Sequence, residues 1–341
     1  MQKIRNPLTI VQKTEGGEIT GDGAHLVTVY DYDGAVLKRE KLDAGEVCVM
    51  PQAPIHDRLE FQAWVGTKSM NADGQSVTVG NGDIDIGAIY KTKSGNTEFD
   101  VVITMATGRT INIQNMTGKS SVNWGDGVTN KASSHTYAAE GKYTIEVAGV
   151  TKLGELVLKR APNYGNNYTC TEIRIGETVT TIGDEAFQAC QSVEKVTIPD
   201  SVTDIGENAF VQNYSLGFVV LHGGADIAAN GFAACSSMRG VILAKGIDTI
   251  RKSFGGGAIK RVVFPETTSS VASLDWGDAI KIYDFSGCQS VPALVDGDIP
   301  YDMDYDIRKI IVPDALYDSW VSATNWAAFA DFIYRASEVV E

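Results

Sequence analysis

Isoleucine and phenylalanine recur along the middle of the chain at a nearly constant interval. Four isoleucines are spaced by 23, 22 and 23 residues, and four phenylalanines by 23, 22 and 22: Ile182, Ile205, Ile227 and Ile250, and Phe187, Phe210, Phe232 and Phe254. Short triplets typical of β-strands keep nearly the same step: IRI (173–175), VTI (196–198), VVL (219–221), VIL (241–243) and VVF (262–264). A period near 22 residues predicts a solenoid whose repeats stack their apolar residues into one continuous core.

Three of the five cysteines occupy the same place in this repeat. They stand in AFQACQSV, GFAACSSM and DFSGCQSV as Cys190, Cys235 and Cys288. Cys190 and Cys235 are two repeats apart, about 10 Å at about 4.8 Å per strand, which is beyond the reach of a disulfide. We expect buried thiols in a ladder, and the odd cysteine count without close pairs argues against a disulfide scaffold or a zinc site.

The phrase TIPDSVTDIGENAFVQN (197–213) resembles the BspA-type leucine-rich repeat, whose pattern is close to IPxSVTxIGxxAFxxCxxL. The resemblance covers residues 171–265 and continues to 313 with weaker agreement, which implies a repeat domain over residues 151–313. HGGADIAANGF (222–232) lacks the IPxSVT phrase and SFGGGAIK (253–260) is shortened, so irregular loops are expected there.

The last part of the chain, residues 314–341, is predicted to be a helical cap on the solenoid. Asp314 follows Pro313 and can begin a helix, in which Leu316 and Trp320 share one face. The next turns of this predicted helix contain Trp326, Phe329 and Ile333. A solenoid needs such a cap to cover its terminal apolar rung.

Residues 26–92 are predicted to form a separate β module. Two alternating apolar runs flank Asp33-Gly34, a pair typical of hairpin turns. LVTVYDYDGAVL (26–37), Gly45, Pro51, Pro54 and LEFQAW (59–64) resemble the Listeria–Bacteroides repeat, also called the internalin B repeat. The resemblance implies a β-grasp-like spacer found on surface proteins.

Residues 93–150 contain WGDG (124–127), HTY (135–137), Gly141, Tyr143 and Thr144. These residues resemble the signature of a PKD domain, which implies an immunoglobulin-like β-sandwich. The resemblance gives Asp126-Gly127 the role of a turn and Tyr137 that of an anchor at a strand corner. His135 is expected to be a hydrogen-bonded structural residue.

Residues 1–25 match no family, and they combine the apolar PLTIV (7–11) with the polar EGGEITGDG (15–23). They are interpreted either as a short docking strand with a linker or as an attachment arm to a larger assembly. The expected architecture is therefore a mostly β, multidomain string of modules that ends in a capped solenoid.

Composition narrows the possible partners. The 341 residues carry a formal net charge of −14, so the surface repels nucleic acid and anionic lipid. No window approaches the 18 apolar residues typical of a membrane-spanning helix. The first residues lack the apolar segment of a secretory signal, so we expect export by another route, such as a virus particle, or a leader that was removed.

Catalytic and metal-binding motifs are not evident. The phosphate-loop-like MTGKSS (116–121) lacks the required first glycine, whose place Ile113 takes. DMDYD (302–306) lacks the glycine and glutamate of a calcium loop. We therefore expect no enzyme activity, no cofactor and no metal site; a glycan-active enzyme with an unrecognised carboxylate pair is the remote alternative.

Two segments contain candidate binding residues. APNYGNNYTC (161–170) groups two tyrosines with asparagines, a combination of flat rings and adaptable amides that suits glycan or protein contacts. The candidates are Tyr164, Asn166, Asn167 and Tyr168, together with Trp276 from SLDWGDAI (273–280). The alternatives are a turn-rich capping loop for the first segment and a buried tryptophan for the second.

The predicted function is recognition through the repeats. The first hypothesis is a phage virion protein, a tail fibre, tail tip or capsid decoration, that binds a bacterial surface glycan or protein. It would contact other virion proteins through its N-terminal region and form a homo-oligomer, with a trimer expected. The alternative is a secreted bacterial cell-surface adhesin of the BspA type.

Overall fold

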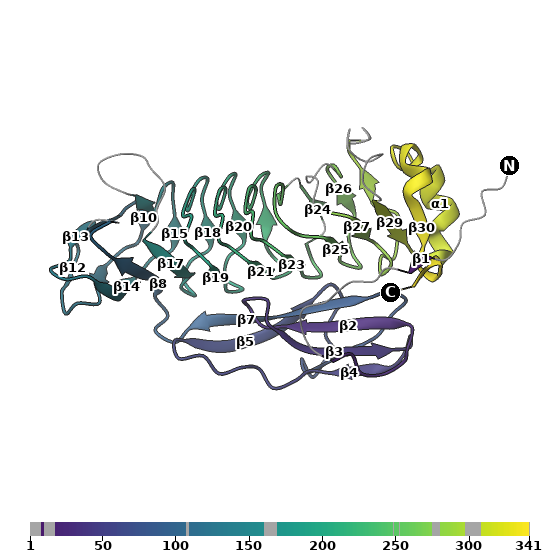
Figure 1. Cartoon of the computed structure of the whole chain (residues 1–341), viewed down its shortest axis with the longest axis horizontal. Coiled ribbons are helices and arrows are strands. Elements are labelled where there is room, and N and C mark those ends of the chain that lie inside the picture. Colours follow the sequence, from purple (N-terminus) through teal and green to yellow (C-terminus); the bar gives the residue numbers. More distant parts are fainter. Residues whose placement is uncertain are drawn as a thin grey trace.

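The computed structural model describes residues 8–9, 18–106, 109–159, 169–247, 249–251, 253–274, 280–296 and 308–340. The protein is mostly β and has N-terminal β-sheets, a β-solenoid and a short C-terminal helix (Figure 1). We name its parts the N-terminal module (residues 18–92), the middle module (residues 97–159) and the repeat solenoid (residues 169–340).

The N-terminal module is a four-stranded sheet covered on one side by a two-stranded ribbon. Its strands are β2 (His25–Tyr30), β3 (Val36–Leu42), β4 (Val47–Val49), β5 (Leu59–Gly66), β6 (Ser76–Thr78) and β7 (Ile84–Thr92). The sheet order is β3-β2-β7-β5 with β2 and β7 parallel, and the ribbon is β4-β6. At the β2–β3 turn, Gly34 has φ +87°, a left-handed conformation that favours glycine. The hairpin predicted at Asp33-Gly34 is therefore present.

The strands of the middle module belong to three sheets, two of which continue into the solenoid. Its strands are β8 (Thr97–Ile103), β9 (Thr110–Ile113), β10 (Met116–Thr117), β11 (Ser121–Asn123), β12 (Thr129–Asn130), β13 (Ser134–Thr136), β14 (Gly141–Ala148), β15 (Lys152–Leu153) and β16 (Leu158–Lys159). Trp124 and Tyr137 are buried, and the Tyr137 hydroxyl donates to the Trp124 carbonyl at 2.9 Å. β8 pairs with β14 on one side and with the first strand of the solenoid, β17, on the other, so one core continues across residue 150.

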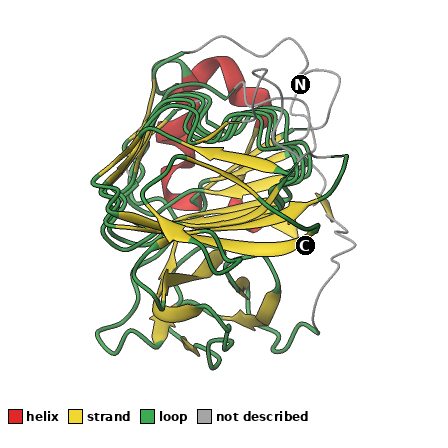
Figure 2. Cartoon of the chain, turned by 90° about the vertical axis from the view of Figure 1, so that its left-hand side faces the viewer, coloured by secondary structure: helices red, strands yellow, loops and turns green. Residues whose placement is uncertain are grey.

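Six turns of the solenoid each contribute one longer and one shorter described strand, and two further longer strands follow. The longer strands are β17 (Cys170–Arg174), β19 (Lys195–Thr197), β21 (Phe218–Leu221), β23 (Gly240–Leu243), β25 (Arg261–Val263), β27 (Ile282–Asp284), β29 (Lys309–Val312) and β30 (Ile333–Arg335). The shorter ones are β18 (Thr181–Ile182), β20 (Asp204–Ile205), β22 (Asp226–Ile227), β24 (Thr249–Ile250), β26 (Ser270–Val271) and β28 (Ala293–Leu294). All paired strands within the solenoid are parallel, as in β18, β20 and β22. Figure 2 looks along the solenoid and shows the turns superimposed.

The phenylalanine series forms a stack through the core. Ring centroids of Phe187 and Phe210 are 5.3 Å apart, those of Phe210 and Phe232 4.9 Å, and those of Phe232 and Phe254 5.5 Å. The ring planes of the last two pairs are almost parallel, with interplanar angles of 5° and 7°, and all four side chains are buried. Ile182, Ile205 and Ile227 are buried beside them, and Ile250 lies on β24. This stacking explains the 22-residue period.

In three repeats, the side chain of the third residue after the phenylalanine bonds to the backbone of a neighbouring turn. Asn213 occupies this position between Cys190 and Cys235, and its Nδ2 donates to the carbonyls of Phe187 at 2.9 Å and Phe210 at 2.7 Å. The Cys235 thiol donates to the Phe210 carbonyl at 3.2 Å, and that of Cys288 to the Pro265 carbonyl at 3.5 Å. The cysteines are free and buried, and burial raises the pKa of Cys190, Cys235 and Cys288 to about 12. They are hydrogen-bonding core residues and poor nucleophiles.

The C-terminal cap is less helical than the sequence predicted. It consists of η1 (Asp314–Leu316), α1 (Tyr317–Ser322), η2 (Trp326–Phe332), β30, η3 (Ala336–Glu338) and β31 (Val339–Val340). Trp320, Trp326 and Phe329 are fully buried and close the end of the core. Ile333 does not extend the helix as predicted, because it pairs with Ile310 and adds strand β30 to the sheet. The N-terminal strand β1 (Leu8–Thr9) pairs with β31, so this part of residues 1–25 lies beside the C-terminus.

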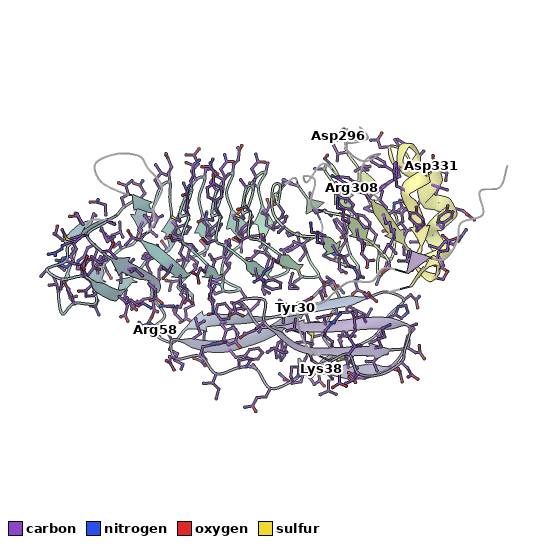
Figure 3. All side chains as sticks on the ribbon, in the orientation of Figure 1. Tyr30, Lys38, Arg58, Asp296, Arg308 and Asp331 are labelled. Atoms are coloured by element: carbon purple, nitrogen blue, oxygen red, sulfur yellow. The ribbon has the colours of Figure 1, made fainter. Side chains whose placement is uncertain are left out.

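The modules follow one another along the chain but are not arranged end to end in space. The N-terminal module folds back along the solenoid and lies over its longer strands, as Figure 1 shows. Phe218, Val220 and Ile242 point outward from β21 and β23 and pack on Ile89, with Tyr30 and Val65 around them. Figure 3 shows Tyr30 on the side of the module that faces the solenoid and Lys38 on the far side.

Candidate recognition groove

The shorter strands line a groove on the solenoid. We call it the polar groove; it is an open depression with a volume of about 570 Å³, lined by Lys152, Thr181, Ile182, Gly183, Asp184, Asp204, Ile205, Gly206, Asp226, Ala228, Ala229 and Arg251. Register places Lys152, Thr181, Asp204 and Asp226 side by side on successive turns. At about 4.8 Å per turn, the row of turns from Lys152 to Arg251 extends about 19 Å along the solenoid.

Small residues keep the groove open. Gly183, Gly206, Ala228 and Ala229 follow the shorter strands, where larger side chains would fill the space. At Gly206, a Cβ atom would lie 2.5 Å from the backbone nitrogen of Asp184, so the turns approach too closely for any other residue. The shape of the groove is therefore built into the backbone.

Charged side chains surround this floor. Asp184, Asp204 and Asp226 are exposed, and Arg251 forms an ion pair with Asp226. The Asp184 carboxylate accepts the backbone N–H of Glu207 at 2.8 Å, which fixes its position. The Thr203 hydroxyl donates to Asp204 at 2.7 Å. The groove thus offers oriented acceptors and two cationic groups to a polar ligand.

The other broad surface of the solenoid, which we call the strand face, is the outward side of the longer strands and is occupied by the N-terminal module. Across this interface Lys195 Nζ donates to Asp33 at 2.7 Å, and Lys68 Nζ donates to Glu266 at 2.9 Å. The backbone N–H of Lys245 donates to the Gly66 carbonyl at 2.7 Å. These contacts span several turns, so a partner could reach the strand face only by displacing the module.

A buried ionic cluster joins the three parts at one end of this interface. Arg174 is nearly inaccessible and contacts Glu98 at 2.9 Å, Asp100 at 2.6 Å and Glu172 at 3.0 Å, while Arg58 reaches Glu98 at 2.6 Å. Burial alone would raise the pKa of Glu98 and Asp100, but hydrogen bonds from the arginines and other donors outweigh it and lower both pKa values. The cluster fixes the relative position of the modules and is not arranged as an acid–base site.

The candidate binding residues from the sequence, Tyr164, Asn166, Asn167, Tyr168 and Trp276, lie outside the described residues. So do Asp302, Asp304 and Asp306 of the acidic loop. Among the residues that the structure describes, no cluster of three or more histidine, cysteine or carboxylate side chains could hold a metal ion. In the same part of the chain, no helix is long and apolar enough to cross a membrane.

His135 lies in the middle module as a structural residue. Its Nε2 is 2.7 Å from Asp126, and its ring stacks on Trp124 at 5.0 Å. Sequence reasoning did not identify the polar groove. The available signal was the row of polar residues that precede Ile182, Ile205 and Ile227, followed by glycine or alanine.

Comparisons with known proteins assign the repeats. Residues 163–276 match the family described as "BspA type Leucine rich repeat region" in six copies. A leucine-rich cell surface protein from Faecalibacterium prausnitzii A2-165 is 26% identical over 46% of this chain and 47% of that one, with a TM-score of 0.33. The matched part is therefore about half of that protein.

A leucine-rich repeat protein from Bacteroides ovatus is 14% identical over 77% of this chain and 79% of its own, with a TM-score of 0.24. A search among curated proteins gave no match. The comparisons assign no family to the N-terminal β-sheets, so the internalin B and PKD resemblances stay predictions. Over residues 163–276, the solenoid therefore consists of repeats similar to the BspA-type leucine-rich repeat.

Proposed function

We propose that this protein is a non-catalytic recognition protein of the bacterial cell surface that binds a polar ligand in the polar groove. The observation that carries this proposal is the contrast between the two sides of the solenoid. The strand face is closed by the N-terminal module, whereas the groove is open and preformed over successive turns. A preformed site loses little entropy when a ligand binds.

The groove suits a ligand with many hydroxyl or amide groups, such as a bacterial surface glycan. Fixed carboxylates accept hydrogen bonds from hydroxyls, and Lys152 and Arg251 can donate to acceptor groups. The small residues on the floor allow close approach of an extended chain. The surface adhesin is favoured over the virion protein, because the repeats match the BspA-type family on which that alternative was based.

A glycan array prepared from bacterial surface polysaccharides tests the binding. The full chain should bind a subset of the array, and Asp204→Asn should weaken that binding at least about tenfold, because it removes a charged acceptor from the centre of the groove. Glu194→Gln is the matched control, since Glu194 is an exposed carboxylate of the same solenoid that does not line the groove. Equal binding by the two variants would exclude the groove as the site.

Immunogold labelling of a producing culture tests the location. Gold on the envelope of intact cells is the expected result. Gold confined to phage-like particles would contradict the surface proposal and favour the virion hypothesis.

A further inference from the structure

His222 occupies a turn position that other repeats fill with glycine, proline or alanine. It begins a four-residue turn, 222–225, which the Ala225 N–H closes on the His222 carbonyl at 3.2 Å. The corresponding turns begin at Pro199, Ala244 and Pro265 and close in the same way. The turn leads directly into β22, whose Asp226 lines the polar groove.

Both ring nitrogens of His222 are engaged by the backbone. Nε2 faces the carbonyl of Val202, and Nδ1 faces the N–H of Gly224 at 3.1 Å. A carbonyl can only accept, so Nε2 must carry the proton, and Nδ1 must accept from Gly224. The turn therefore requires the neutral imidazole, because a proton on Nδ1 would face the Gly224 N–H.

The surroundings offer no compensation for a positive charge on this ring. The side chain is buried, and among the described residues no carboxylate forms an ion pair with it. The flanking turns carry Asp200, which bonds Gln62, and Lys245, which pairs with Glu266. His56 and His135 differ, since each contacts an aspartate that would stabilise its charged form.

We propose that His222 is a pH-sensitive latch of the polar groove: its protonation opens turn 222–225 and loosens the wall formed by β22. Histidine changes charge between about pH 5 and 8. Acidification in this range favours the open turn, so the groove holds its ligand at neutral pH and releases it in acid. The effect on ligand rests on the proposed function, whereas the opening of the turn does not.

Hydrogen exchange of the full chain, without ligand, tests the latch. The Gly224 and Ala225 amides report opening, and Thr268, which closes the equivalent histidine-free turn on Pro265 at 3.0 Å, is the internal control. Because only the open turn can take up a second ring proton, opening rises as the pH falls from 7.5 to 5.5, by at most about tenfold per pH unit. This rise remains after correction for intrinsic exchange, and Thr268 should show none.

Two variants copy residues found at this position in other repeats. His222→Pro and His222→Ala should remove the pH dependence of the Gly224 and Ala225 amides. The latch would be overturned if exchange in the wild-type protein did not differ between pH 7.5 and pH 5.5 after the correction, or if both variants showed the same rise as the wild type. If the turn opens in acid as expected but the protein binds nothing on the glycan array, the proposed ligand is refuted and the latch is not. The failure of the latch and the failure of the proposed function can therefore be distinguished.

Discussion

The fold-back of the N-terminal module predicts that Phe218 holds it on the solenoid. Phe218 points out of the core, is buried, and lies 5.2 Å from Tyr30 between ring centroids. It fits against Gly34, where even a Cβ atom would come within 2.7 Å of its ring. Phe218→Ala should therefore remove the centre of the interface and leave the solenoid core in place.

The magnitude follows from the size of the apolar contact. Truncation of a buried phenylalanine costs about 3–5 kcal/mol. The buried apolar contact includes just Ile89, Val220 and Ile242 besides Phe218 among the described residues, so most of this loss falls on docking. At 1.4 kcal/mol per tenfold, the undocked population should rise about a hundredfold or more.

Two backbone amides provide the assay. The N–H groups of Lys245 and Glu266 donate to the Gly66 and Thr67 carbonyls across the interface, at 2.7 and 2.9 Å. Their hydrogen exchange should accelerate about a hundredfold in Phe218→Ala, while the Phe210 amide, bonded within the solenoid at 2.7 Å, stays protected. Unchanged exchange at Lys245 and Glu266 would refute the docking role of Phe218.

Tyr214→Ala is the matched control for this variant. Tyr214 is an aromatic residue of the same repeat, but 40% of its surface is exposed. Its removal should change stability by less than about 0.5 kcal/mol and leave both reporter amides unaffected. Faster exchange at Lys245 in this control would show that aromatic loss anywhere in the repeat loosens the module.

Three further predictions concern stability, measured by thermal or chemical unfolding. Asn213→Ala should destabilise by about 1 kcal/mol more than Asn213→Cys, because a thiol can still donate to a neighbouring carbonyl; equal losses would contradict this. Ala234 has φ +55°, so Ala234→Gly should raise the free energy of unfolding by about 0.5–1 kcal/mol. Gly256→Ala, at the equivalent position of the next repeat, should lower it by a similar amount. Arg174→Met should cost about 3 kcal/mol at pH 7. The pKa of Glu98 is lowered in the folded protein, so ionised Glu98 stabilises the fold at a pH above the ordinary glutamate pKa, and this contribution is lost in acid. The destabilisation by Arg174→Met should therefore become smaller below about pH 4.5.

The repeat could be predicted from the sequence because each turn places an isoleucine and a phenylalanine at the same two core positions. The docking of the N-terminal module could not be predicted from the repeat period, because it depends on which residues of a short strand face outward. A signal was nevertheless present. Phe218–Leu221 is apolar at four successive positions, whereas Lys195–Thr197 alternates, and a strand apolar on both sides is typical of a sheet covered on both faces.

The groove was missed for a different reason. Its shorter strands contain two residues each, which is too few to show a periodic pattern. Its floor is formed by the small residues Gly183, Gly206 and Ala228. Clusters of aromatic and amide residues are typical of binding sites and can be recognised in a sequence. Small residues between charged ones do not by themselves indicate a binding site. Such a site becomes visible when the turns are stacked in register.

The covered strand face changes which side of the repeats can evolve recognition. The module contacts the solenoid from Glu172, which accepts the Tyr32 hydroxyl at 3.2 Å, to Glu266, four longer strands further along. Substitutions on this face must preserve the fit against the module, so the face is constrained like a core. Asp204 and Asp226 are exposed on the shorter strands of the groove, so they can change with less effect on the buried isoleucines that follow them. Variation between related proteins should therefore concentrate at positions such as Thr181, Asp204 and Asp226.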